Sequence, residues 1–499
     1  MNEVTMTSVL PLMLIMLPLV GGALALLVGP RYPRIGSVLI VVVAVLTFIL
    51  AAVAALDARD GLIRTLSLIQ IAPPVWIVMR IDPFGALFSL TVAALFMLAL
   101  IYAFGYLRDD PRKWRFFVFA MACHSCMNGV AYAGNLVTLF VFYELFSLLS
   151  YPLITHDRSR EAMAAGLKYL VYIIGGGSFI LIGTILIFHL GGQTLFSPGG
   201  MPEMAGGRTL LLTTLVCLTL GFGVKSALMP LHGWVPDAHP AAPAPFSAVL
   251  SGVMVATGIF GLLRVWFELF GPARLVELEV LPWLGLIAGV SVLLAALRAI
   301  SEDNLKRRLA WSTISQMAYV VLAVSVMGSQ ALAGALVHIN HHAFLKGGLF
   351  FCAGLIVTVT GMTRVSELTG LSRRMPVTAF CLTLLALGLV GVPPLSGFIS
   401  KWLLGLGLAD AGAMLHLGIM LAGALLAAVY LWPIIYRIWL IPEDGQFKRS
   451  AGLEASPWML AALVLAALVS VVLGLAAVLP GFPVELAAVA RDWLMGPGP

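Results

Sequence analysis

The sequence predicts an all-α membrane protein with about fourteen transmembrane helices, built from two inverted five-helix repeats with two broken helices. Three observations lead to this fold class. Of the 499 residues, 61% are hydrophobic and 10% are charged, whereas a soluble domain carries about 25% charged residues. The apolar residues form long segments, each close to the roughly 20 residues that a membrane-spanning helix needs. Prolines interrupt two of these segments at corresponding positions in the two halves of the chain.

The apolar segments, taken in order, predict the individual spans. They cover residues 8–28, 35–56, 84–106, 115–132, 135–154, 163–190, 209–229, 244–270, 280–300, 309–328, 331–360, 377–400, 412–436 and 457–480. Spans 4–8 and spans 9–13 are the expected halves. Because each half has an odd number of helices, the second half is inverted with respect to the first.

One external loop is expected to have structure of its own. Residues 63–71 and 75–82 flank Ala72-Pro73-Pro74 and predict a short hairpin outside the bilayer. The chain then divides into N-terminal helices with this hairpin, a first repeat with Glu144 and Lys225, a second repeat with Lys346 and Lys401, and a last helix with a tail. These parts cover residues 1–110, 111–271, 272–441 and 442–499.

The basic residues predict the orientation. With the N-terminus outside, roughly 18 Lys and Arg residues fall in inside loops and roughly 6 fall outside. The net charge of +6 then comes from basic residues in the cytoplasmic loops and does not indicate nucleic-acid binding. Residues 1–7 contain Glu3 but no Lys or Arg, so they lack the basic region of a signal peptide. We expect a retained first helix, both termini on the outer side, and a bacterial inner membrane.

Five basic residues lie within apolar spans: Lys168, Lys225, Arg264, Lys346 and Lys401. Arg does not release its proton, whereas the pKa of a buried Lys shifts readily. Lysines in the core, with mostly arginines in the loops, therefore favour a function that needs changes of protonation. The alternative is a lysine that reaches the interface from near a helix end, which suits Lys168 better than Lys225 or Lys401.

Glu144 is the one acidic residue placed squarely in the middle of a predicted span. A charge there costs about 2.5–3.5 kcal/mol on the insertion scale, and a partner usually offsets this cost. Lys225 is the expected partner, because a Glu–Lys pair at about 4 Å gains roughly 4 kcal/mol at an effective dielectric near 20. A static ion pair that only locks two helices together is the alternative.

Prolines mark both lysine segments as broken helices. Lys225 precedes prolines at positions 230, 236 and 240, and Lys401 follows Pro393-Pro394. Proline removes a backbone hydrogen bond, and such breaks are tolerated at membrane depth where they line a wet cavity or packed protein. Each lysine belongs to the fourth helix of its half.

A row of titratable residues is expected on the eleventh span. His338, His342 and Lys346 follow the spacing i, i+4, i+8, so they share one helix face. Such a row could relay protons. Two alternatives are a zinc site, for which no third ligand is evident, and histidines that are simply buried and hydrogen-bonded.

No cofactor or metal site is evident on the chain. The five cysteines lie in apolar stretches, and Cys123 and Cys126 form a CxxC without the surrounding βαβ pattern of a redox motif. No GxGxxG follows a predicted strand, and no cysteine cluster suits an iron–sulfur centre. Redox chemistry would have to come from partner subunits, and no catalytic chemistry is assigned to this chain.

Several segments in combination resemble the antiporter-like subunits of respiratory complex I, membrane-bound hydrogenases and Mrp-type multisubunit cation/proton antiporters. The resemblance runs from about Asp82 to Lys401, most of the chain. It is carried by YELFSLLSYPLI around Glu144, VKSALMPLHGWVPDAHPAAPAP from Lys225, DNLKRRLAWSTISQ, HINHHAFLKGGLFF, LSRRMPVTAF and GVPPLSGFISKW. Its early part is similar to the D-type Mrp subunit, whereas HPAAPAPFSAVLSGVMVATGIFGLLR is closer to hydrogenase-type members.

The resemblance implies fourteen helices with two inverted repeats and proton movement through two half-channels joined by a central polar axis. It assigns the family's buried glutamate to Glu144 and its two helix-break lysines to Lys225 and Lys401. His338, His342 and Lys346 match the polar row of the eleventh helix. One departure is Ala256, where many members carry a lysine. No titratable residue lies between Phe246 and Leu263, which weakens the expectation of a continuous path.

The sequence therefore predicts a proton-translocating, antiporter-like subunit of a multisubunit ion-pumping complex. Its partners would be other membrane subunits, protons, and Na⁺ or K⁺ if the complex is an antiporter; a redox-driven pump is the other form. The alternatives are a non-conducting scaffold that anchors a soluble enzyme, such as one handling inorganic carbon or hydrogen, and a solitary transporter of organic solutes.

Overall fold

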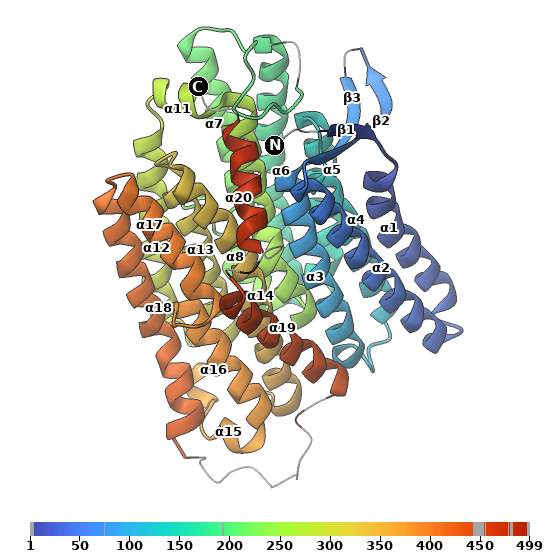
Figure 1. The fold of residues 1–499 in the computed structure, drawn as a ribbon. Helices are drawn as coiled ribbons and strands as arrows, with labels where there is room; N and C mark the ends of the chain where they lie inside the picture. Colours follow the sequence, from blue (N-terminus) through green and yellow to red (C-terminus); the bar gives the residue numbers. More distant parts are fainter. Residues whose placement is uncertain are drawn as a thin grey trace.

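The chain folds into a bundle of helices that carries a small β-sheet at one end (Figure 1). The computed structural model describes residues 4–73, 75–191, 194–442, 454, 456–477, 479 and 483–496. In this part of the chain, eleven helices are long and apolar enough to cross a membrane. They are α1 (Leu10–Val28), α2 (Pro33–Arg59), α3 (Pro83–Tyr106), α5 (Leu136–Ile154), α6 (Arg160–Gly191), α7 (Arg208–Lys225), the segment Ala244–Phe270, α12 (Leu281–Ser301), α14 (Ser329–Thr360), α18 (Met414–Leu440) and α19 (Pro457–Leu475).

Three further helices occupy the other positions at which the sequence predicts a span: α4 (Lys113–Ala131), α13 (Leu305–Val324) and α16 (Pro376–Val390). Helices α4 and α13 are long but less apolar, because they turn polar side chains inward. The buried polar residues are His124, Ser125 and Asn128 on α4, and Ser312, Thr313, Ser315 and Gln316 on α13. The shorter elements are α8 (Val235–Ala241), α11 (Pro272–Glu277), a 3₁₀ turn (Val365–Glu367), α15 (Leu371–Arg374), α17 (Ser396–Asp410) and α20 (Pro483–Met495).

Helix α14 lies at the centre of the bundle (Figure 1). It packs against α3 and α9 (Ala244–Val249) on one side, and against α13, α16 and α17 on the other. Helices α19 and α20 also contact it. Because neighbours surround α14, its residues from Ala331 to Ile356 are buried, including its histidines and its lysine. The polar row predicted on this helix is therefore enclosed by protein on all sides.

The sheet confirms the predicted external hairpin and adds a strand. Strand β2 (Leu62–Ala72) pairs antiparallel with β3 (Val75–Ile81), in a register that places Thr65 opposite Arg80. The unpredicted strand β1 (Val4–Thr7) pairs in parallel with the start of β2. Its four residues lie too near the chain end to form a recognisable pattern of their own, so only the pairing reveals the strand. Pro74, part of the predicted turn, lies outside the described residues.

Both predicted helix breaks are present. Helix α7 ends at Lys225, and α8 begins only at Val235. Helix α16 ends at Val390, and α17 begins at Ser396. The predicted span 377–400 stopped short, because the helix that follows the break continues to Asp410 and contains Lys401 in its first half. Prolines locate the breaks correctly, but local sequence does not show how far the second helix extends.

The last part of the chain differs from the prediction of one helix and a tail. The tail contains α20, whose residues Leu486, Ala487, Ala490 and Leu494 are buried. Helix α20 packs against α3 and α14 (Figure 1). A 13-residue helix falls below the length of a span, so apolar length does not predict it. The described ends of the chain both lie at the end of the bundle that carries the sheet (Figure 1).

Candidate functional site

Lys225 is fully buried at the last position of α7, where the helix breaks. Its ammonium donates a hydrogen bond to the hydroxyl of Ser147 on α5 at 2.5 Å. It also lies 4.6 Å from the ring centre of Tyr143 and 4.0 Å from that of Phe146. Aromatic faces attract cations. The lysine is therefore held by a neutral oxygen and two rings from one face of α5.

Glu144 lies on the same stretch of α5 but faces a different neighbour. The residue is half-buried, and its Oε1 has no hydrogen-bond partner among the described residues. The carboxylate packs against Gly177 of α6, where an added Cβ would stand 2.4 Å from Oε1. The expected ion pair with Lys225 is not formed. The carboxylate points toward α6, and the Lys225 ammonium donates to Ser147 instead. One turn of α5 separates the two contacts.

A run of three glycines on α6 makes room for this carboxylate. A Cβ at Gly176 would meet the carbonyl oxygen of Gly221 on α7 at 3.0 Å, and one at Gly177 would meet Glu144. A Cβ at Gly175 would meet nothing within 4 Å. The middle glycine therefore brings α6 and α7 together, and the third leaves space beside Glu144.

The predicted row on α14 is buried along one face. The ring centres of His338 and His342 lie 6.0 Å apart. The Lys346 ammonium donates to the Leu309 carbonyl oxygen of α13 at 2.9 Å and to the Ser312 hydroxyl. Neither ring nitrogen of His342 has a hydrogen-bond partner among the described residues. Those residues contain no group of three His, Cys, Asp or Glu side chains placed to hold a metal.

Histidines of α14 also contact the second broken helix. His338 Nδ1 lies 3.0 Å from the Ser400 hydroxyl of α17, and His341 Nδ1 lies 2.7 Å from the Ser396 carbonyl oxygen. Sequence reasoning missed His341, because its spacing places it off the face of His338 and His342. Lys401 donates to the carbonyl oxygens of Leu389 and Val390, at 2.7 and 2.8 Å. Because α16 ends at Val390, these carbonyl oxygens have no hydrogen-bond donor within the helix. The helix break therefore supplies the acceptors of the lysine.

The segment Ala244–Phe270 packs against α7, which carries Lys225, and against α13 and α14, which hold the Lys346 site. A Cβ at Gly258 would meet the Ser226 amide nitrogen beside Lys225, and one at Gly252 would meet the Ala343 carbonyl oxygen of α14. Ala256 lies between these glycines and is fully buried. Ser251 forms a 2.6 Å hydrogen bond with Thr313 of α13. Two turns of this segment, Leu250–Met254 and Arg264–Phe270, are π-helical, a feature common at functional sites.

A second charged cluster lies near the sheet, and sequence reasoning found only its Arg264. The Arg264 guanidinium donates to both carboxylate oxygens of Asp82, at 2.8 and 2.9 Å, and to Glu268. Arg80 of β3 binds Asp82 at 3.0 Å and Glu268 at 2.7 Å. Trp493 of α20 donates to Glu268 at 3.1 Å. The i, i+4 spacing of Arg264 and Glu268 was the available signal, whereas Asp82 and Arg80 approach only through the fold.

Lys168 lies apart from the buried lysines. Its side chain is 44% exposed and forms a 2.7 Å ion pair with Asp237. Arg307 of α13 binds the other oxygen of Asp237 at 2.6 Å. The structure therefore agrees with the interpretation of Lys168 as a residue that reaches the surface from near a helix end.

Comparison with known proteins places this geometry in a family. A family model described as "NADH:quinone oxidoreductase/Mrp antiporter, TM" matches residues 133–427. A second model, "NADH-Ubiquinone oxidoreductase (complex I), chain 5 N-terminus", matches residues 74–117. The chain is 34% identical over 452 residues to NADH-quinone oxidoreductase subunit N of Desulforudis audaxviator, covering 88% of this chain and 89% of the relative. It is 28% identical over 427 residues to the D-type component of a Na(+)/H(+) antiporter of Alkalihalophilus pseudofirmus, covering 85% of each.

A solved structure shares the fold over nearly the whole chain. It is a chain of the membrane-bound sulfane sulfur reductase, an archaeal respiratory membrane complex. The TM-score is 0.85 with 26% sequence identity, and the match covers 98% of each chain.

Proposed function

We infer that this chain, which belongs to the family of NADH:quinone oxidoreductase and Mrp antiporter transmembrane subunits, is a proton-translocating, antiporter-like subunit of a multisubunit ion-pumping complex. Its relatives are named as subunits of an NADH-quinone oxidoreductase and of a Na(+)/H(+) antiporter, and its fold neighbour belongs to a respiratory membrane complex. The proposal includes fourteen spans, counting α4, α13 and α16, with spans 4–8 and 9–13 as inverted repeats. It also places the protein in a bacterial inner membrane, with both termini on the outer side, as the positive-inside rule predicts.

One observation carries the proposal that lysines move the proton. Among the described residues, Lys225, Lys346 and Lys401 donate only to hydroxyl and carbonyl oxygens. No carboxylate in the described part of the chain lies within 4.0 Å of any of the three. An ammonium that is buried without a counter-charge is not locked in its charged form, so it can give up its proton. Arg264 has the opposite arrangement, with two carboxylates around a fixed charge.

The proposed path begins at Lys225. This lysine has two acceptors within one turn of α5, the Ser147 hydroxyl that it contacts and the Glu144 carboxylate that it does not. Movement toward Glu144 would hold its proton, and return to Ser147 would release it. Glu144 is half-buried beside α6, so a neighbouring subunit or a cation that approaches α6 could shift this balance.

From Lys225 the proton passes to the face of α14. The Ser251–Thr313 hydrogen bond joins the segment Ala244–Phe270 to α13, where Lys346 is bound, and Lys346, His342 and His338 form the row that is proposed to lead to Lys401. Moving one charge across 100 mV requires about 2.3 kcal/mol, the scale of making or breaking one partly buried ion pair. The partner subunits supply this energy, either by exchange for Na⁺ or K⁺ or by a redox reaction.

Proton flux in vesicles that contain the intact complex tests the role of the first pair. We expect Glu144→Gln and Lys225→Gln each to lower flux at least tenfold, because each removes one charge of the proposed switch. Lys168→Gln is the matched control, since it removes an exposed lysine of the same bundle, and flux should stay near the wild-type rate. If both pair variants pump normally, the proposal is wrong.

Ala256 favours a second function, that of a non-conducting scaffold for a soluble enzyme. The buried segment around it offers hydroxyl groups but no titratable side chain between Phe246 and Leu263. Purification of the intact complex under mild conditions, with identification of every subunit, separates the possibilities. Iron–sulfur and flavin subunits indicate a redox-driven pump, small membrane subunits alone indicate an antiporter, and one large soluble enzyme together with unchanged flux in the lysine variants indicates a scaffold.

A further inference from the structure

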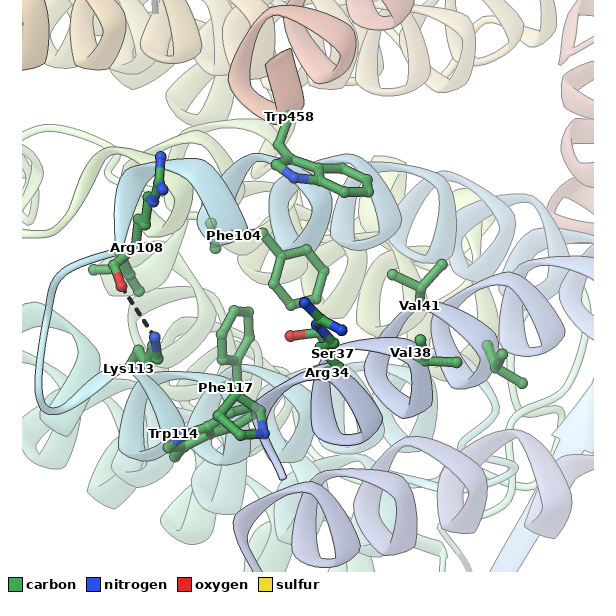
Figure 2. Close-up of a pocket in the computed structure, with 14 residues that line it drawn as sticks. Arg34, Ser37, Val38, Val41, Phe104, Arg108, Lys113, Trp114, Phe117 and Trp458 are labelled. Atoms are coloured by element: carbon green, nitrogen blue, oxygen red, sulfur yellow. Dashed lines mark hydrogen bonds between the residues drawn. The ribbon is translucent and has the colours of Figure 1, made fainter. Parts of the chain in front are cut away.

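A groove of about 590 Å³ opens between α2, α3, α4 and the start of α19, at the end of the bundle opposite the sheet (Figure 1 and Figure 2). One wall is a continuous row of aromatic rings. Ring centres are 6.1 Å apart for Trp458 and Phe104, 4.9 Å for Phe104 and Phe117, and 5.9 Å for Phe117 and Trp114. Val38 and Val42 of α2 extend the apolar surface and are 62% and 46% exposed.

The floor of the groove is fixed by close packing. Trp114 is only 9% exposed, and its ring lies against Gly29 at the end of α1 and Gly36 in the first turn of α2. A Cβ would stand 2.5 Å from that ring at Gly29 and 2.7 Å from it at Gly36. The two glycines therefore leave room for the indole ring and fix its position in the groove.

Three basic residues border this groove: Arg34, Arg108 and Lys113 (Figure 2). The Lys113 ammonium donates to the Arg108 carbonyl oxygen at 3.0 Å, which leaves its charge uncompensated. The adjacent Asp110 binds His156 at 3.0 Å and lies 3.7 Å from Arg112. None of the three basic side chains forms an ion pair with a described carboxylate. The groove thus combines three unneutralised cations with an apolar, lipid-accessible wall.

We propose that this groove binds one anionic phospholipid. The phosphate lies against Arg34, Arg108 and Lys113, and an acyl chain lies along the aromatic wall toward Val38 and Val42. Basic pockets between helices at the membrane interface bind anionic headgroups, and Trp is typical of that depth. The charge is what selects a lipid over a neighbouring helix, because an apolar helix would leave three cations unpaired. The bound lipid would join the N-terminal helices to α19.

Lipid binding to the purified, delipidated complex tests this proposal. Phosphatidylglycerol and phosphatidylcholine are titrated separately, and retained lipid per chain is measured by mass spectrometry. We expect one phosphatidylglycerol per chain, with phosphatidylcholine bound at least tenfold more weakly. The variant R34Q/R108Q/K113Q should lose roughly 100-fold in affinity for phosphatidylglycerol, because each basic residue near the surface contributes about fivefold. The variant R160Q/R298Q/R373Q removes the same charge from other helices at this end and should bind as the wild type does.

A second variant keeps the test decisive if the triple variant does not assemble. Ser37→Trp fills the groove from α2 without removing charge, and it should also displace the lipid. Equal retention of both lipids, or normal phosphatidylglycerol binding in R34Q/R108Q/K113Q and S37W, would overturn the proposal. So would displacement of the lipid by millimolar inorganic phosphate, which would identify a simple anion site, or a cross-link from the groove to a helix of another subunit in the native complex.

Discussion

At the scale of single residues, the protein treats buried cations in two different ways. Arg264 is surrounded by Asp82 and Glu268, and Arg80 joins the same carboxylates, so this cluster carries two positive and two negative charges. The lysines at the helix breaks have only neutral acceptors. A balanced cluster is stable but cannot titrate without breaking, whereas a lysine held by neutral oxygens can exchange its proton. The chemistry of Arg and Lys therefore separates a structural site from a candidate transport site.

Asp82→Asn tests the structural role of the charged cluster. The substitution leaves Arg264 with one fewer counter-charge in a fully buried position, so the loss of stability should be large, about 3–5 kcal/mol. Thermal unfolding of the purified protein in detergent measures this loss as a lower Tm. Glu279→Gln is the matched control, because its ion pair with Arg208 is exposed and worth about 0–1 kcal/mol. Equal shifts for the two variants would contradict the assignment.

At the scale of helices and strands, the sequence predicts those elements that depend on residues within their own segment. Apolar length located the long spanning helices, and prolines located both breaks, because each acts through its own segment. Strand β1 and helix α20 were missed, because pairing with β2 and burial against α14 stabilise them, and no periodic pattern records such contacts. The predicted contact between Glu144 and Lys225 failed for the same reason. The positions of both residues within apolar spans predicted a pair, but Gly177 of α6 decides where the carboxylate points.

Gly177→Ala tests how α6 positions that carboxylate. The new Cβ would stand 2.4 Å from Glu144 Oε1, and the flexible side chain is what must move. A displacement of this size should lower proton flux by the intact complex about tenfold while leaving assembly intact, since small misplacements of a reacting group are costly. Gly175→Ala is the control on the same helix, because its Cβ meets nothing within 4 Å. A normal rate for Gly177→Ala would mean that the orientation of Glu144 is unimportant.

At the scale of the whole molecule, α14 packs against both lysine-bearing breaks: its Phe350 stacks on His239 of α8, with ring centres 4.9 Å apart, and its histidines contact α17. It contacts α13 through Lys346 and α17 through His338 and His341. The sequence predicted the row on α14 and both break lysines, because each is a polar residue in an otherwise apolar span. It could not predict the neutral acceptors, which come from backbone carbonyls and hydroxyls brought together by the breaks. The groove between α2, α3, α4 and α19 likewise arises only when distant segments assemble.

Lys225 and Lys401 are proposed to carry the proton and not merely to supply fixed charge. Replacing each with Arg in the intact complex, and measuring proton translocation in vesicles, tests this role most directly, because Arg keeps the positive charge but cannot be deprotonated. We expect Lys225→Arg and Lys401→Arg to lose translocation as fully as the Gln variants, while Lys168→Arg stays at the wild-type rate. Translocation near the wild-type rate in the two buried Arg variants would show that neither lysine needs to release its proton and that both supply only structural charge.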